Sequence, residues 1–319
     1  MNTTRRHASW RALIATAALL AVIATACGDD GDEPTSSDGT GSAAEFEGTL
    51  RIGAIPDQDP ERLQRTYGGV AEHLAEYLPG ATVEYVPVTD YEGAVTGFRV
   101  GDLDAVWFGG LTGVQARLEV EGAQALVQRD IDEAFTSVFI AAAATGLDTM
   151  SDVSDLAALE GHSFTFGSES STSGRLMPQS FLTEAGLDID SSFAGLPGFS
   201  GSHDATIEVV SAGTYEVGAL NSQVWDDRVA EGVVDETAVV EIFRTPPYYD
   251  YHWVVRPDLD ERLGDGATDA FVDAMLALDA SDEADAEILD LFGAESFIRT
   301  ENDNYAAIEA VARAVGLIR

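Results

Sequence analysis

Short apolar runs alternate with helical patterns along most of the chain, beginning near residue 50. Runs typical of buried strands cover residues 50–55, 83–86 and 105–108. Between the first two runs, apolar residues recur at helical spacing from Leu63 to Leu78, and a second helical pattern ends at Gly101. Strands that alternate with helices in this way predict an α/β fold built on parallel sheets.

The same order of elements returns later in the chain and predicts a second lobe. A strand over residues 163–166 is followed by a hydroxyl-rich loop and a helix, and a further strand covers residues 216–220. Residues 101–106 and 213–218 each follow a predicted helix and show the same order: a glycine, then an acidic residue, then a strand. Two lobes of similar construction explain this repetition, with binding loops at the carboxyl ends of their parallel strands.

The middle and the end of the chain are expected to connect the lobes. A long apolar run over residues 136–143 predicts a buried connecting strand, and residues 239–243 and 253–255 predict the return. Two crossings of this kind would form a hinge. An amphipathic C-terminal helix that includes Ile308 and Val311 should pack back on the first lobe.

The N-terminus has the pattern of a signal peptide. A basic start with Arg5, Arg6 and Arg11 precedes an uncharged, mostly apolar run that is too short for a comfortable membrane span. Cys27, the sole cysteine, follows small residues and resembles the lipid-attachment site of bacterial lipoproteins; an ordinary signal peptide with an incidental cysteine is the alternative. Residues 28–44 carry no large apolar side chain and predict a flexible tether.

These patterns give an expected organisation for the whole chain. Its parts are a signal peptide (1–26), a lipid-anchored tether (27–45), lobe 1 (46–135 plus 250–319) and lobe 2 with the hinge strands (136–249). Lipid at Cys27 would hold the folded lobes at the extracytoplasmic face of the cell membrane.

The charge balance excludes several classes of partner. The chain has 17 basic residues, all of them arginine, against 56 acidic residues, and its formal net charge is −39. Since hydrophobic residues make up 45% of the chain, this acidity belongs to the surface of folded lobes and does not indicate disorder. Repulsion between like charges makes nucleic acid and anionic membrane surfaces unsuitable partners.

The hydroxyl-rich stretch from Gly167 to Gly174 is the strongest candidate for a functional site. It lies between a predicted strand and a predicted helix. The first turn of a helix leaves amide donors unpaired and carries partial positive charge, so hydroxyls placed there form a site for an anion. Taken alone, the same hydroxyls would more often serve as an ordinary N-cap and loop.

Five short motifs in the chain carry a family resemblance. They are Asp90-Tyr91, residues 106–111, Ser171-Thr-Ser-Gly174, residues 201–203 and Thr245-Pro246. With them, residues 50–318 resemble the type II periplasmic substrate-binding proteins of the phosphonate, phosphite and phosphate ABC transporter group. The resemblance implies an α/β fold with two lobes and a hinge of two crossing strands. Within that group, the chain is most similar to a branch named for selenate binding.

The resemblance also implies a set of ligand-binding residues. These are Tyr91, Phe108, Gly109, Ser171, Thr172, Ser173 and His203. The three hydroxyl residues should hold an oxyanion together with helix amides, and the histidine should approach it from the same lobe. The tyrosine and the backbone of the Phe-Gly pair should close over it from lobe 1. Phe108 should face the cleft, and Trp107 should fill the core.

One departure from the family pattern bears on the ligand. Relatives that take aminoalkylphosphonates use acidic residues to hold the ammonium group, whereas this chain has Gln223 near the corresponding position. A compact inorganic oxyanion, or a phosphonate without the amine, therefore fits better.

The sequence thus predicts a solute-binding protein without a chemical step. It would be a monomer that delivers a small oxyanion to an ABC permease with a separate ATPase subunit. No cofactor is implied, and the five histidines show no metal-binding spacing. Two alternatives remain: a secreted hydrolase that uses Ser171 or Ser173 with His203 as the base, and the ligand-binding module of a sensory receptor.

Overall fold

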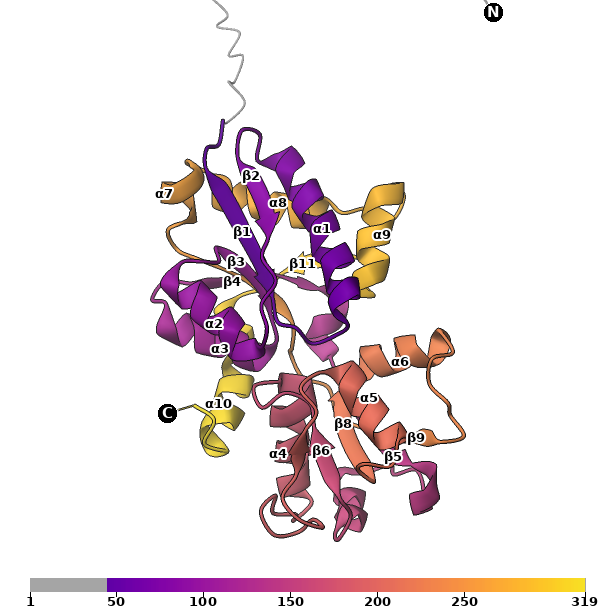
Figure 1. The fold of residues 1–319 in the computed structure, drawn as a ribbon. Coiled ribbons are helices and arrows are strands. Elements are labelled where there is room, and N and C mark those ends of the chain that lie inside the picture. Colours follow the sequence, from indigo (N-terminus) through magenta and orange to yellow (C-terminus); the bar gives the residue numbers. More distant parts are fainter. Residues whose placement is uncertain (1–44, 319) are drawn as a thin grey trace, which may run out of the picture. The chain divides into compact units, whose positions relative to one another are not determined.

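The computed structural model describes residues 45–318. The predicted signal peptide, the lipid-anchor candidate Cys27 and nearly all of the predicted tether lie outside this range. Within residues 45–318, no helix is both long and apolar enough to cross a membrane. The strands of this range form two separate sheets, and the helices pack around them (Figure 1). We call the elements around the six-stranded sheet lobe 1 and those around the five-stranded sheet lobe 2.

Lobe 1 is built on a mixed sheet with the strand order β11-β4-β10-β3-β1-β2. Its strands are β1 (Thr49–Ala54), β2 (Thr82–Tyr85), β3 (Ala105–Phe108), β4 (Gln124–Arg129), β10 (His252–Val255) and β11 (Phe297–Arg299). Strand β1 runs parallel to β2 and β3, whereas β10 is antiparallel to both β3 and β4.

The helices of lobe 1 form two groups. Helix α1 contacts α8 and α9, while α3 contacts α2 and α10 (Figure 1). The α-helices are α1 (Pro60–Tyr77), α2 (Tyr91–Val100), α3 (Gly110–Glu119), α7 (Leu259–Leu263), α8 (Ala267–Ala277), α9 (Glu283–Phe292) and α10 (Ala306–Ala314). Two short 3₁₀ helices are η1 (Asp130–Ala134) and η5 (Asn302–Tyr305).

Local sequence accounts for the ends of the first helices. Helix α1 starts after Asp59, whose Oδ1 accepts the amides of Glu61 and Arg62. Helix α2 starts after Asp90, whose Oδ1 accepts the Gly93 amide at 2.7 Å. It ends at Gly101 with φ of 84°, the left-handed conformation that glycine adopts without steric cost. The predicted stop at Gly101 is confirmed.

Lobe 2 repeats the construction on a smaller sheet with the order β7-β6-β8-β5-β9. Its strands are β5 (Ser137–Ala142), β6 (Phe164–Phe166), β7 (Gly198–Phe199), β8 (Val217–Asn221) and β9 (Val239–Arg244). Its α-helices are α4 (Met177–Glu184), α5 (His203–Ser211) and α6 (Ser222–Ala230). Its short helices are η2 (Ala143–Thr145), η3 (Val153–Leu159) and the π-helix η4 (Thr172–Leu176).

The expectation of parallel sheets is wrong at one strand in the middle of each sheet and at the edge strand β11, which is antiparallel to β4. Strand β5 is antiparallel to β8 and β9, as β10 is to β3 and β4. Strands β5 and β10 each begin where the chain has just crossed over from the other sheet. The two passages pair with each other, since the amides of Phe135 and Tyr248 donate to each other's carbonyl oxygens at 2.9 Å. These paired passages form the two crossing segments of the fold.

Candidate functional site

The loops that follow the parallel strands of the two sheets contact each other. The Leu111 amide at the start of α3 donates to Thr172 Oγ1 in lobe 2 at 2.9 Å. The His203 amide at the start of α5 donates to the carbonyl oxygen of Asp57 in lobe 1 at 3.0 Å. The crevice at the carboxyl ends of parallel strands, where ligands bind in open α/β sheets, is therefore closed on itself here.

The Ser-Thr-Ser turn lies at this crevice as the start of the π-helix η4. Ser171 is the N-cap, and its Oγ accepts the Gly174 amide at 2.9 Å. The next two amides, of Thr172 and Ser173, belong to the first turn, where the helix itself offers no acceptor. The carbonyl of Ser173 is fixed by the Ser137 hydroxyl at 2.7 Å, while Ser173 Oγ is buried and has no hydrogen-bond partner among the described residues.

Thr172 has a different position from the one expected for a ligand-binding hydroxyl. Its Oγ1 accepts the Leu111 amide from lobe 1, and its hydroxyl lies beside the carboxyl of Asp250. A Cβ added to Gly109 would lie 3.0 Å from Thr172 Oγ1, so the glycine permits this close approach. The Thr172 side chain thus joins the lobes, and its amide is the group left for an anion.

Tyr91, the first residue of α2, is buried and places its hydroxyl in the same region. Its Oη lies near the Ser171 hydroxyl but makes no hydrogen bond of good geometry among the described residues. Burial, together with the nearby Asp57 carboxyl, raises the pKa of Tyr91 well above its usual value. The phenol is therefore a proton donor at neutral pH.

Asp250, in the second crossing segment, is a buried carboxyl at the start of α3. Its Oδ1 accepts the Gly110 amide at 2.8 Å, while Oδ2 has no partner among the described residues. Burial raises the pKa of Asp250 to about 7, although the Gly110 amide opposes this rise. Near neutral pH this carboxyl can therefore accept a hydrogen bond when it is ionised or donate one when it is protonated.

His203 lies behind the turn in a chain of hydrogen bonds. Its Nδ1 accepts the Asn221 amide at 3.3 Å, so Nε2 carries the proton and faces Tyr251 Oη at 3.2 Å. Asn221 Nδ2 also donates to Tyr251 Oη at 3.0 Å, which directs the Tyr251 proton toward Asp57. Burial lowers the pKa of His203 to about 4 and raises that of Asp57 to about 6.

Besides the Arg175 guanidinium, which lies over the Phe166 ring, three buried polar atoms around this turn lack a hydrogen-bond partner among the described residues. They are Tyr91 Oη, Ser173 Oγ and Asp250 Oδ2. A buried polar group without a partner costs free energy, so such a group points to an external ligand. Two hydroxyl donors, helix amides and one carboxyl oxygen together suit an oxyanion that carries a proton on one oxygen.

Of two aromatic residues of β3, Trp107 is buried in the core as expected, whereas Phe108 does not face the cleft. Phe108 is fully buried and packs edge-on against Phe98, with ring centroids 5.8 Å apart, inside lobe 1. Trp107 instead stacks on Tyr251 at 5.9 Å and borders a small cavity beside Asn221. Both faces of β3 are buried, so alternation along the strand could not identify the face toward the cleft.

Gln223 is fully used in the contact between lobes. Its Nε2 donates to the Phe292 carbonyl at 2.7 Å, and its Oε1 accepts a hydrogen bond from Arg129. Arg129 also forms a bidentate pair with Asp132 in lobe 1. The amide side chain therefore connects α6 to lobe 1 and is not free to meet an ammonium group.

Sequence reasoning missed Asp250, Tyr251 and Asn221 as members of the site. Asn221 had a local signal, because it follows the predicted strand 216–220 and caps α6 through Val224. Asp250 and Tyr251 precede β10 in a segment without periodicity, so no local pattern singled them out.

The geometry does not support the hydrolase alternative. Ser171 Oγ is occupied as an N-cap, and within the described part of the chain no hydrogen bond joins His203 to Ser171 or Ser173. Asp204, beside the histidine in sequence, pairs with Arg228. Residues 45–318 also contain no group of three or more His, Cys, Asp or Glu placed to hold a metal ion.

Comparison with known proteins agrees with this geometry. The family model for "ABC transporter, phosphonate, periplasmic substrate-binding protein" matches residues 52–305. The "Probable ABC transporter phosphite binding protein PhnD1" of Prochlorococcus marinus (strain MIT 9301) is 45% identical over 271 residues, which cover 85% of this chain and 91% of that protein. The "Phosphate-import protein PhnD" of Mycolicibacterium smegmatis is 32% identical over 212 residues, 63% of this chain and 62% of that protein.

A solved structure has the same fold. PhnD1 from Prochlorococcus marinus in complex with methylphosphonate superimposes with a TM-score of 0.82 at 44% identity, covering 85% of this chain and 99% of that one. Assignment to a selenate-binding branch stays a prediction. The chain belongs to the phosphonate-binding family of type II periplasmic substrate-binding proteins, which are extracytoplasmic components of ABC importers and not enzymes.

Proposed function

We propose that this protein captures a small, protonated phosphorus oxyanion of the phosphite, methylphosphonate or phosphate type. The observation that carries this proposal is the set of three buried, unpartnered atoms, Tyr91 Oη, Ser173 Oγ and Asp250 Oδ2. The amides of Thr172 and Ser173 would hold the anionic oxygens at the start of η4, as helix N-termini do. The backbone at Phe108 and Gly109 would cover the ligand from lobe 1, with His203 behind the turn.

Asp250 would select the protonation state of the ligand. Its Oδ2 can accept a hydrogen bond from a P–OH group when the carboxylate is ionised, or donate one to a dianion when it is protonated. Either way, the ligand and Asp250 must share one proton. Sulfate and selenate carry no proton near neutral pH, so Asp250 alone would have to supply the shared proton, and their binding would weaken as the pH rises through about 7, where this carboxyl loses its proton.

A compact ligand suits the closed loops, because Tyr91, Ser173 and Asp250 are all buried around the turn. A hydrogen, hydroxyl or methyl substituent on phosphorus needs less space there than a long alkyl chain. The names of the relatives, a phosphite-binding and a phosphate-import protein, are consistent with this range.

Capture would involve closure of the lobes and no chemical step. We infer that the monomeric protein delivers its ligand to an ABC permease driven by a separate ATPase subunit. Lipid at Cys27 would keep it at the outer face of the membrane.

Calorimetric titration with a panel of anions tests the proposal. At pH 7.5, where most Asp250 carboxyls are ionised, phosphite, methylphosphonate and phosphate should bind more tightly than sulfate and selenate. Affinity should fall as the pH rises above about 8, because the shared proton is then lost. Sulfate binding as tight as that of phosphite would refute the role given to Asp250.

A further inference from the structure

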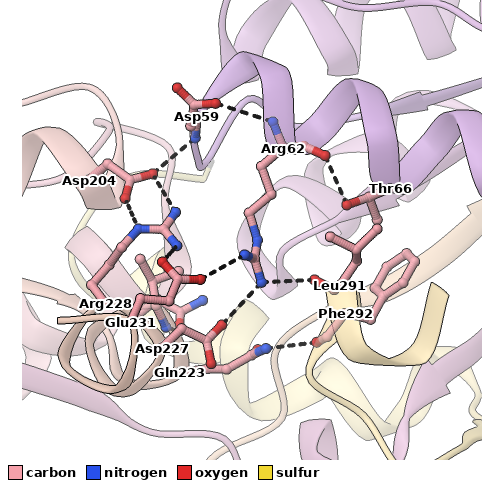
Figure 2. Close-up of polar contacts among 12 residues, drawn as sticks. Asp59, Arg62, Thr66, Asp204, Gln223, Asp227, Arg228, Glu231, Leu291 and Phe292 are labelled. Atoms are coloured by element: carbon pink, nitrogen blue, oxygen red, sulfur yellow. Dashed lines mark hydrogen bonds and ion pairs between the residues drawn. The ribbon is translucent and has the colours of Figure 1, made fainter. Parts of the chain in front are cut away.

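A chain of ion pairs outside the candidate ligand site links α1 of lobe 1 to α6 of lobe 2 (Figure 2). At its centre is Arg62, whose Nη1 lies 3.2 Å from Glu231 Oε1 and whose Nη2 lies 3.3 Å from Asp227 Oδ2. Nη2 also donates to the carbonyl oxygen of Leu291 at 3.4 Å. A guanidinium of one lobe thus bridges two carboxylates of the other.

A second arginine holds the lobe 2 carboxylates in place. Arg228 Nη1 donates to Glu231 Oε2 at 3.0 Å, and its Nε donates to Asp204 Oδ1 at 2.7 Å. Asp204 Oδ2 in turn accepts the main-chain amide of Asp59 at 2.9 Å, just before α1 (Figure 2). Both of these carboxylates are therefore oriented toward lobe 1 by a residue of their own lobe.

Burial gives these pairs more weight than ordinary surface pairs. The side chains of Arg62 and Arg228 are 13% and 9% exposed, whereas those of Asp227 and Glu231 are 30% and 44% exposed. Partly buried charges interact more strongly than fully solvated ones, yet salt still screens them.

Closure of the lobes brings together two strongly acidic bodies. Residues 136–249 contain 3 arginines and 17 acidic residues, and residues 46–135 with 250–319 contain 11 arginines and 33 acidic residues. Repulsion between them opposes the closed arrangement. A cation at the point of contact offsets this repulsion.

We propose that Arg62 is a positioning residue for ligand capture: it stabilises the closed arrangement and so raises ligand affinity without touching the ligand. This inference rests on the proposed function, because it assigns a residue that sets the affinity of that same site. The apparent affinity of a binding protein falls with the fraction of molecules in the binding-competent state. Loss of Arg62 lowers that fraction.

The experiment compares Arg62→Gln with Arg244→Gln in the full chain. Arg244 also bridges two carboxylates, Asp226 and Glu241, but all three residues belong to lobe 2. Its loss therefore removes the same charge and leaves the contacts between the lobes intact. With methylphosphonate at about 10 mM salt, Arg62→Gln should raise Kd about three- to tenfold, and Arg244→Gln should leave it unchanged. At about 1 M salt the difference between wild type and Arg62→Gln should shrink.

Two further measurements test the role of Arg62 without a ligand and with a variant of a second residue. In ligand-free protein, the amides of Asp59 and His203, which donate across to the other lobe, should exchange hydrogen faster in Arg62→Gln. Asp227→Asn should also raise Kd, and the double variant should bind no more weakly than Arg62→Gln alone.

Equal Kd values and equal exchange rates in the two arginine variants would overturn the proposal. Fully additive losses in the double variant would do the same. If the wild-type protein bound none of the anions tested, the proposed function would fail, and the exchange rates alone would then decide the role of Arg62.

Discussion

The two lobes share a strand order but contribute different chemistry to the cleft. The order β2-β1-β3-β10-β4 in lobe 1 matches β7-β6-β8-β5-β9 in lobe 2. Tyr91 and His203 are the first residues of α2 and α5, the helices that follow the equivalent strands β2 and β7. Yet Tyr91 has an unpartnered hydroxyl, whereas His203 is bonded on both ring nitrogens.

Helix starts show the same contrast. At the start of α3 in lobe 1, the amides of Gly110 and Leu111 are already taken by Asp250 and Thr172. At the start of η4 in lobe 2, the N-cap Ser171 takes only the Gly174 amide. A helix N-terminus is therefore not an anion site in itself, because a side chain from elsewhere can occupy its donors. In this protein we assign anion binding to lobe 2 and the choice of protonation state to Asp250.

The largest effect should come from removing the Asp250 charge. In ligand-free protein, Asp250→Asn should stabilise the fold by roughly 4 kcal/mol more at pH 8 than at pH 4, since each pKa unit corresponds to about 1.4 kcal/mol. The pKa of this carboxyl rises on folding from 3.8 to about 7, so the wild type loses stability as the pH rises through that interval. Urea unfolding of both proteins at the two pH values measures the difference.

The exposed Asp148 supplies the control for this comparison. Asp148→Asn leaves a solvated position and should change stability by the same small amount at both pH values. A pH-independent effect of Asp250→Asn would show that the carboxyl is not desolvated.

His203 in lobe 2 should give a pH dependence of opposite sign. Its pKa falls from 6.5 to about 4 on folding, so stability is fully present above pH 6.5 and is lost as the pH falls toward 4. Relative to His203→Gln, wild-type protein should therefore lose roughly 3 kcal/mol between pH 8 and pH 4. The same urea titrations apply, and parallel stability curves for the two proteins would contradict the buried, neutral imidazole.

The donor role of lobe 2 is tested by Ser173→Ala. Its Oγ has no partner among residues 45–318, so the variant should keep its ligand-free stability and bind methylphosphonate about 1.5–3 kcal/mol more weakly, as for a hydrogen bond to a charged group. Calorimetry and thermal unfolding report the two quantities. Ser163→Ala is the matched control, because Ser163 bonds to Glu216 just before β6 and should affect stability alone.

The smallest effect is expected for Tyr91→Phe on the lobe 1 side. This change also removes an unpartnered hydroxyl, and affinity should fall by on the order of 1 kcal/mol. Titration with the same ligand measures it. If Tyr91→Phe lost more affinity than Ser173→Ala, lobe 1 and not lobe 2 would supply the main hydrogen-bond donor to the ligand.

Much of the fold was predictable from local pattern. The apolar run at residues 105–108 coincides with β3, and the predicted helix stop at Gly101 is observed. Strand direction was not predictable, because an apolar run such as residues 136–143 identifies a buried strand without fixing its neighbours. The antiparallel pairing of β5 and β10 depends on where the chain crosses between sheets.

The candidate site divides in the same way. Ser171, Thr172 and Ser173 stand next to one another, so their residue types and the following helix indicate an anion cradle. Asp250 lies more than seventy residues further on, and its role depends on burial beside Gly110. The signal peptide and the lipid anchor at Cys27 stay predictions from sequence.

The sequence by itself determined the elements, the second lobe and the hydroxyl-rich turn, since each rests on spacing and residue type within a short window. Only the tertiary structure decided which hydroxyls are free, because Thr172 is used between the lobes whereas Ser173 has no partner in the part of the chain that the structure describes. It also decided that the Phe108 side chain lies in the core of lobe 1, and that Arg62 meets two carboxylates of lobe 2. The physical reason is that hydrogen-bond satisfaction and burial depend on groups far apart in the chain.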